Sequence, residues 1–198
     1  MKILLVGASG TLGKAVVAEL GQRHDIISAG RSSGELVDIA DYTSVTALLH
    51  RVGKLDAIVS AAGNVHFGPL SDMTPDLLGI GLKDKLMGQV NLVLAGQGAL
   101  NDGGSFTLIT GILTHDPIRY GASASMVNGA LESFVKSAAI ELPRGLRINA
   151  VSPTVLVESM EGYGPYFRGY KPVPAAEAAL GFAKSVEGAQ TGQVFRIG

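Results

Sequence analysis

Two kinds of apolar pattern alternate along this chain. Short apolar runs such as 2–6 and 56–60 are typical of buried parallel strands. Between them, apolar residues recur three and four positions apart, as in 14–20 and 42–52, which predicts helices with one buried face. Further strands are predicted at 25–29, 35–38, 105–110, 146–151 and 193–197, and further helices at 77–100, 122–142 and 175–187.

The regular order of strand and helix predicts the fold class. Repeated strand–helix units imply an α/β, Rossmann-type doubly wound parallel sheet of about seven strands with helices on both faces. Ligands of such sheets bind beyond the carboxyl ends of the strands. We expect one domain over residues 1–198. Residues 153–174, rich in glycine and proline, follow the sixth strand and are expected to form a mobile flap over the site.

The turn between the first strand and the first helix is rich in glycine. Gly7, Gly10 and Gly13 allow a tight turn, a close approach to a ligand and tight packing of the helix on the strand. The helix start presents free N–H groups and the positive end of its dipole, which is a favourable place for a pyrophosphate. The residues expected to contact a dinucleotide here are Gly7, Ser9, Gly10, Thr11, Leu12 and Gly13.

Composition narrows the classes of function. The 198 residues are 46% hydrophobic and carry a net charge of −1 with both signs interspersed, so nothing indicates nucleic acid or a membrane surface as a partner. No run approaches the roughly 18 apolar residues of a membrane span. The chain has no cysteine, and its four histidines lack ligand spacing, so no metal site is expected. These features predict a cytoplasmic protein that binds a small molecule.

The end of the second strand bears on the choice of dinucleotide. A carboxylate there would bind the ribose hydroxyls of NAD, but this chain has Arg31 and Ser32 after Gly30. A guanidinium with hydroxyls beside it suits a 2′-phosphate, which favours NADP(H) over NAD(H). The alternative is that Arg31 is a solvated loop residue. Asp38 and Ile39 are expected along the adenine.

These pieces, in this order, resemble the short-chain dehydrogenase/reductase family over nearly the whole chain. The resemblance implies an NADP(H)-dependent oxidoreductase and adds Ala61, Ala62, Gly63, Pro153 and Val155 to the cofactor contacts. The segments that carry it are 7–13, 30–31, 38–39, 60–63, 141–153 and 191–195.

The catalytic residues of that family are missing. The positions of its Tyr and of the Lys four residues later fall on Ala124 and Asn128. Its Ser falls on Gly111, and its helical Asn on Lys85. The phenol that passes a proton to the carbonyl, and the ammonium that lowers its pKa, are therefore not in their usual places.

Three other residues are candidate replacements. Tyr120 lies one helical turn before Ala124, His115 follows the fifth strand, and Lys85 could enter the site from the helix predicted at 77–100. Each has an ordinary alternative: a packed loop residue for Tyr120, an exposed residue for His115, and a solvated charged face for Lys85.

The sequence leaves three functions open. The first is an oxidoreductase with an altered proton relay that acts on a small carbonyl or alcohol. The second is an inactive dinucleotide-binding sensor or regulatory protein, and the third an oligomeric scaffold that the cofactor stabilises. The resemblance also implies a homodimer or homotetramer formed through the helices predicted at 77–100 and 122–142.

Overall fold

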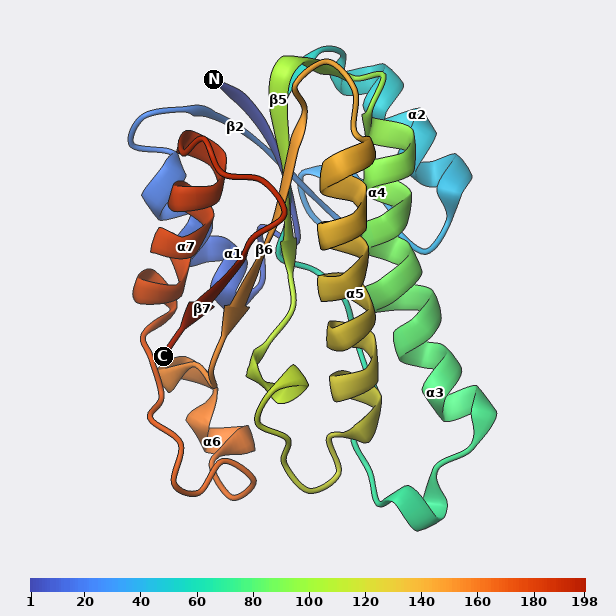
Figure 1. Ribbon diagram of the computed structural model, residues 1–198, viewed down its shortest axis with the longest axis vertical. Coiled ribbons are helices and arrows are strands. Elements are labelled where there is room, and N and C mark those ends of the chain that lie inside the picture. The colour runs from blue at the N-terminus through green and yellow to red at the C-terminus, as the bar shows by residue number, and fades with distance from the viewer.

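The apolar runs form the strands of one parallel sheet. A computed structural model describes all residues, 1–198, and its seven strands lie in the order β3-β2-β1-β4-β5-β6-β7 (Figure 1). The chain moves from β1 to one edge and then returns to build the other side, so the order reverses between β1 and β4. That reversal opens the crevice used for ligands in such sheets. The strands are β1 (Lys2–Val6), β2 (Asp25–Gly30), β3 (Glu35–Leu36), β4 (Leu55–Ser60), β5 (Leu100–Ile109), β6 (Arg147–Pro153) and β7 (Val194–Ile197).

Helices cover both faces of this sheet. Helices α1 and α7 pack side by side on one face, and α2, α4 and α5 cover the other (Figure 1). The predicted fold class is therefore confirmed. The α-helices are α1 (Thr11–Leu20), α2 (Tyr42–Val52), α3 (Pro75–Gly81), α4 (Gly88–Gly96), α5 (Ala122–Glu141), α6 (Met160–Tyr163) and α7 (Ala175–Glu187).

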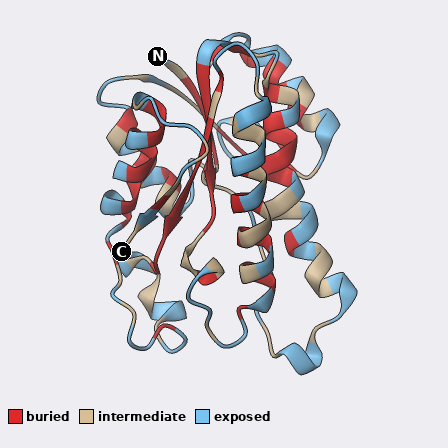
Figure 2. Ribbon diagram, in the orientation of Figure 1, coloured by how far each residue is buried: buried red, intermediate tan, exposed pale blue.

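The core lies in two layers, one on each side of the sheet. Ile3 and Leu5 of β1 pack under α1 and α7, whereas Leu4 and Val6 face α2, α4 and α5. The alternation follows from the two-residue period of a strand and explains why the strands read as continuous apolar runs. Figure 2 shows the buried residues concentrated in the sheet and on the inner faces of the helices.

The helix predicted at 77–100 differs in detail. Helical structure runs from Pro75 to Gly96, with a π-helical turn, η2 (Leu82–Met87), between α3 and α4. The predicted end at residue 100 is wrong, because Leu100 pairs with Leu55 and begins β5. A π turn carries an extra residue per turn and is common at functional sites.

The segment after β6 folds back over the carboxyl ends of the strands. It contains a short 3-10 turn, η4 (Val157–Ser159), and α6, and a single bridge joins Leu156 to Val173. Two other 3-10 turns, η1 (Leu70–Asp72) and η3 (Ile112–Thr114), lie in the loops after β4 and β5. None of the helices has the length and apolar character needed to cross a membrane.

Candidate active site

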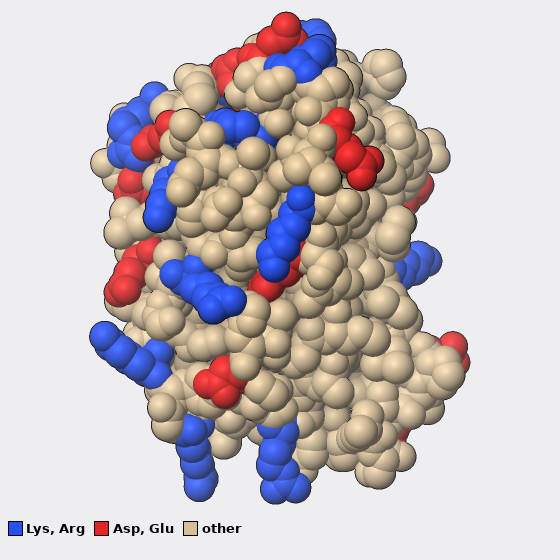
Figure 3. Space-filling view, viewed as in Figure 1, with Lys and Arg blue, Asp and Glu red and all other residues tan.

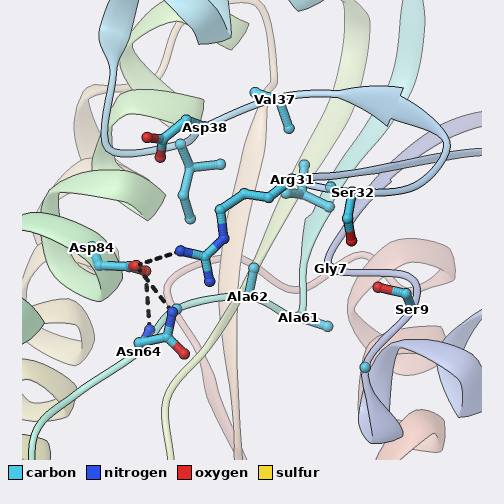
Figure 4. A pocket seen from close by; sticks show the side chains of 15 residues that line it. Gly7, Ser9, Arg31, Ser32, Val37, Asp38, Ala61, Ala62, Asn64 and Asp84 are labelled. Atoms are coloured by element: carbon cyan, nitrogen blue, oxygen red, sulfur yellow. Dashed lines mark hydrogen bonds and ion pairs between the residues drawn. The ribbon is translucent and has the colours of Figure 1, made fainter.

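A cavity of about 300 Å³ lies beyond the carboxyl ends of β1, β2 and β4. It is the crevice at the strand-order reversal (Figure 4). Ten of the residues predicted to bind the dinucleotide line it: Gly7, Ser9, Gly10, Arg31, Ser32, Asp38, Ile39, Ala61, Ala62 and Gly63.

The glycine turn has the geometry of a phosphate cradle. Gly7 has a φ of +88°, and a Cβ there would meet the carbonyl of Ala61 at 2.8 Å. A Cβ on Gly13 would overlap the carbonyl oxygen of Gly7, so this glycine lets α1 pack directly on the turn. Gly10 caps α1 without a side-chain hydrogen bond, which leaves the first-turn N–H groups for a ligand. These residues fit a dinucleotide pyrophosphate.

Arg31 is paired across this cavity. Its guanidinium lies 3.5 Å from the carboxylate of Asp84, which comes from the π turn (Figure 4). The same carboxylate accepts hydrogen bonds from the backbone and side-chain nitrogens of Asn64, at 3.0 and 3.1 Å. The sequence predicts Arg31 as a phosphate ligand, but in the structure its guanidinium already faces the carboxylate of Asp84.

A second cavity of about 310 Å³ adjoins the first, and Gly63 and Asn64 line both. Three further predicted cofactor contacts, Leu12, Pro153 and Val155, line this second cavity, whereas Thr11 and Gly13 line neither. The positions where the family resemblance places catalytic residues meet here: Lys85, Gly111, Ala124 and Asn128.

Lys85 and Asn128 are in direct contact. The Lys85 Nζ donates hydrogen bonds to the Asn128 side-chain oxygen at 2.7 Å and to the Thr110 carbonyl at 3.2 Å. Both acceptors are neutral, and burial lowers the pKa of Lys85 to about 8. An ammonium has three donors, so one N–H of Lys85 is left without a hydrogen-bond partner in the protein.

The rest of the second cavity is mainly apolar. Val65 and Phe67 follow β4, Leu113 lies in η3, and Tyr163 and Phe167 come from the segment after β6. Lys85 is the only charged residue in its lining. The backbone at Gly111 and the methyl group of Ala124 supply no acid, so the titratable groups in the lining are the Lys85 ammonium and the Tyr163 phenol.

The structure does not bring His115 or Tyr120 into this cavity. His115 Nε2 lies 2.9 Å from the buried carboxylate of Glu132, and Arg196 lies beside the same ring. Glu132 also accepts from the Thr110 hydroxyl at 3.3 Å. The Tyr120 ring packs edge-on against Tyr166 in a separate small hollow. Of the three candidate replacements, only Lys85 lines the cavity.

Sequence reasoning did not single out Asn64, Asp84 or Glu132 as site residues. Asp84 stands between two lysines, a pattern that also suits a solvated surface, and Asn64 simply follows the predicted Ala61–Gly63 contacts. The charged run 83–85 inside an otherwise apolar helical segment is the signal that points to this turn.

A family model described as Enoyl-(Acyl carrier protein) reductase matches residues 8–194. The chain therefore belongs to the short-chain dehydrogenase/reductase family, whose members are oxidoreductases that bind a nicotinamide dinucleotide. The family resemblance of the sequence is confirmed.

Individual relatives agree with this assignment. The chain is 26% identical to the pig (Sus scrofa) protein Carbonyl reductase [NADPH] 2 over 182 residues, 81% of this chain and 73% of that protein. It is 25% identical to human (Homo sapiens) L-xylulose reductase over 181 residues, 80% of this chain and 73% of the relative. The crystal structure of the protein lin1944 from Listeria innocua is 55% identical, with a TM-score of 0.99 and full coverage of both chains.

Proposed function

We propose that this protein is an NADP(H)-dependent oxidoreductase that reduces small apolar carbonyl compounds, or oxidises the matching alcohols, with Lys85 as its proton donor and acceptor. The observation that carries the proposal is the contact of Lys85 with Asn128 in the second cavity. The chain keeps an ammonium at the reaction site although the family's Lys position is Asn128.

The dinucleotide site supports the cofactor assignment. The backbone N–H groups at the start of α1 would hold the pyrophosphate, and Ile39 and Ala62 would flank the adenosine. Arg31 and Ser32 suit a 2′-phosphate, which favours NADP(H). When bound, this cofactor supplies the hydride for carbonyl reduction.

Lys85 supplies the proton. In reduction, its ammonium donates a proton to the carbonyl oxygen and becomes a neutral amine; in oxidation, the amine accepts the proton of the alcohol. Asn128 and the Thr110 carbonyl hold Nζ in place in either state. A pKa near the operating pH is the favourable value for such an acid–base group.

The apolar walls set the class of substrate. Val65, Phe67 and Leu113 face the cavity together with Tyr163 and Phe167. No arginine and no second lysine is available there to bind a carboxylate or phosphate. An uncharged aldehyde, ketone or secondary alcohol therefore fits best, and residues 153–174 would act as the flap that covers it.

Exposed apolar side chains support assembly through the helices after β4 and β5. Ile80 and Leu94 lie on α3 and α4, and Met126 and Ile140 lie on α5, all exposed. Figure 3 shows few charged side chains over α3 and the lower part of α5. We propose that a second copy covers this surface in a homodimer or homotetramer, so sedimentation should give a mass above that of one chain.

Replacement of Lys85 tests the assignment. Lys85→Met keeps a flexible, unbranched side chain of similar length and removes the ammonium, so kcat for NADPH-driven reduction of small aldehydes and ketones should fall by about 10²–10⁴-fold. Lys83→Met is the matched control, because Lys83 lies in the same π turn and is exposed. Titration with NADPH, run in parallel, separates lost chemistry from lost cofactor binding.

The pH dependence of turnover provides a second test of the role of Lys85. Since the folded pKa of Lys85 is about 8, the ammonium needed for reduction is lost as the pH rises through about 8. The rate of alcohol oxidation, which needs the amine, should rise over the same range. A wild-type protein that binds NADPH but turns over no carbonyl or alcohol would contradict this proposal and support a binding-only role.

A further inference from the structure

The dinucleotide cavity contains a carboxylate that the family resemblance does not account for. Asp84 lies in η2, far along the chain from β2, yet it lines the same cavity as Arg31 and Ser32. In Figure 4 the Arg31 side chain extends from the end of β2 across the cavity toward Asp84 and Asn64. The guanidinium and the carboxylate are 3.5 Å apart.

The two members of this ion pair are held very differently. Asp84 receives two hydrogen bonds from Asn64, at 3.0 and 3.1 Å, and its side chain is only 22% exposed. Arg31 makes no other side-chain hydrogen bond or ion pair, and its side chain is 65% exposed. The carboxylate is therefore the fixed partner, and the guanidinium is the one that can move.

We propose that Asp84 determines how strongly this protein prefers the 2′-phosphorylated dinucleotide, by competing with the 2′-phosphate for Arg31. The inference rests on the proposed dinucleotide binding but not on the proposed chemistry. To bind a 2′-phosphate, Arg31 has to give up the carboxylate of Asp84. A dinucleotide with a free 2′-hydroxyl makes no such demand.

The charge balance gives the direction of the effect. A carboxylate beside Arg31 offsets part of the positive charge that the guanidinium presents to a phosphate, so Asp84 weakens binding of the phosphorylated form selectively. Exposed ion pairs contribute up to about 1 kcal/mol, which corresponds to a factor of about five in affinity. Asp84 thus moderates the preference that Arg31 creates.

Asp84 lies beside the proposed reaction site, because it is in the same π turn as Lys85. Asp84 and Lys85 are consecutive, and they line different cavities: Asp84 the dinucleotide cavity, Lys85 the second one. Gly63 packs against Lys85 at the boundary, where a Cβ would meet the Lys85 Cα at 2.8 Å. One turn of helix therefore supplies both the selecting carboxylate and the reacting ammonium.

The test is a set of dissociation constants for the full chain. Binding of NADPH, NADH, 2′,5′-ADP and 5′-AMP is measured by calorimetry for wild type, Asp84→Asn, Arg31→Ala and the double variant. Asp84→Asn should tighten NADPH and 2′,5′-ADP by about threefold to fivefold and change NADH and 5′-AMP by less than about twofold. In the Arg31→Ala background, the tightening should largely disappear, because nothing remains to compete for.

Two controls keep the result interpretable. Asp76→Asn removes a carboxylate from the start of α3 that does not line the cavity, so it should leave the ratio of NADPH to NADH affinity unchanged. Asp84→Ala should repeat the sign of Asp84→Asn, with thermal denaturation showing that both variants are folded.

The outcomes separate this inference from the proposed function. An unchanged or weaker NADPH affinity in folded Asp84→Asn overturns the inference alone. A tightening that persists in full without Arg31 also overturns it, since direct repulsion by Asp84 would then be the cause. Failure of the wild-type protein to bind either dinucleotide overturns both the inference and the proposed cofactor.

Discussion

The two adjoining cavities differ in how they are built. The dinucleotide cavity is formed mainly by backbone and small residues at the ends of β1, β2 and β4, and it keeps the family's glycine turn. The second cavity is formed by side chains from η2, α5, η3 and the segment after β6, and its four expected catalytic positions are all changed. The cavity proposed for the cofactor therefore keeps the family's pattern, whereas the residues around the proposed reaction site depart from it.

We propose that the departure from the family pattern in the second cavity is an exchange of two side chains rather than a simple loss. The Lys position of the family carries Asn128, and its helical Asn position carries Lys85. The Lys85 Nζ and the Asn128 Oδ1 are 2.7 Å apart, so the ammonium and the amide lie in one small region. The ammonium comes from η2 and the amide from α5, the reverse of the arrangement that the family resemblance implies. The family's Tyr position carries Ala124, which has no acidic group, and the one phenol in this lining, Tyr163, comes from the segment after β6.

The largest expected effect comes from undoing this exchange. Lys85→Asn should lower kcat by about 10²-fold or more, because the acid–base group is lost. Asn128→Lys alone would set two ammonium groups side by side and should also lower activity. The double variant restores one ammonium and one amide, so its kcat should exceed that of Lys85→Asn by about tenfold. Steady-state kinetics of all three would show it, and equal rates for the double variant and Lys85→Asn would refute an exchange.

A smaller effect is expected from a substitution in the glycine turn beside the dinucleotide cavity, at Gly13. In Gly13→Ala the new Cβ overlaps the Gly7 carbonyl, so α1 must shift away from the turn, at a cost of about 1–3 kcal/mol. NADPH binding should weaken by about tenfold or more, as followed by fluorescence titration. Gly79→Ala is the control: its Cβ meets nothing within 4 Å, and alanine is the better helix former in α3. Wild-type NADPH affinity in Gly13→Ala would show that the turn does not hold the pyrophosphate.

The smallest effect on turnover is expected at His115, which lies outside both cavities. His115→Ala leaves the buried Glu132 without its 2.9 Å partner, so the free energy of unfolding should fall by about 1–3 kcal/mol. Turnover should stay within about a factor of two. Denaturation and kinetics would be compared with His50→Ala, which removes an exposed histidine of α2. A loss of turnover well above that factor in a folded variant would return His115 to the list of catalytic residues.

Much of the fold follows from local pattern. Continuous apolar runs identify the strands, because they are buried on both faces, and period-3.6 spacing identifies most helix limits, because each helix buries one face against the sheet. The helical segment after β4 is harder to read. Glycines at 79, 81, 88, 96 and 98 blur its ends, and nothing local indicates that Leu100 pairs with Leu55. Pairing in the sheet decides that boundary.

The sequence predicts the residues of the dinucleotide cavity more completely than those of the second cavity. The glycine turn, Arg31 and Ala61–Gly63 follow strands directly, so the sequence places them at the carboxyl edge of the sheet. Lys85, His115 and Tyr120 are equal candidates by sequence, since each is a titratable residue near an expected strand or helix end. Only the packing of η2 against α5 selects Lys85, and the Glu132 contact holds His115 elsewhere.

By itself, the sequence determined the parallel sheet, the glycine turn and the absence of a Tyr-Lys pair, because these depend on residues close together in the chain or on the simple lack of a side chain. The tertiary structure decided which charged groups face one another: Lys85 with Asn128, and Arg31 with Asp84. Such contacts join residues 43 and 53 positions apart. They depend on how helices pack across the sheet, which no local pattern encodes.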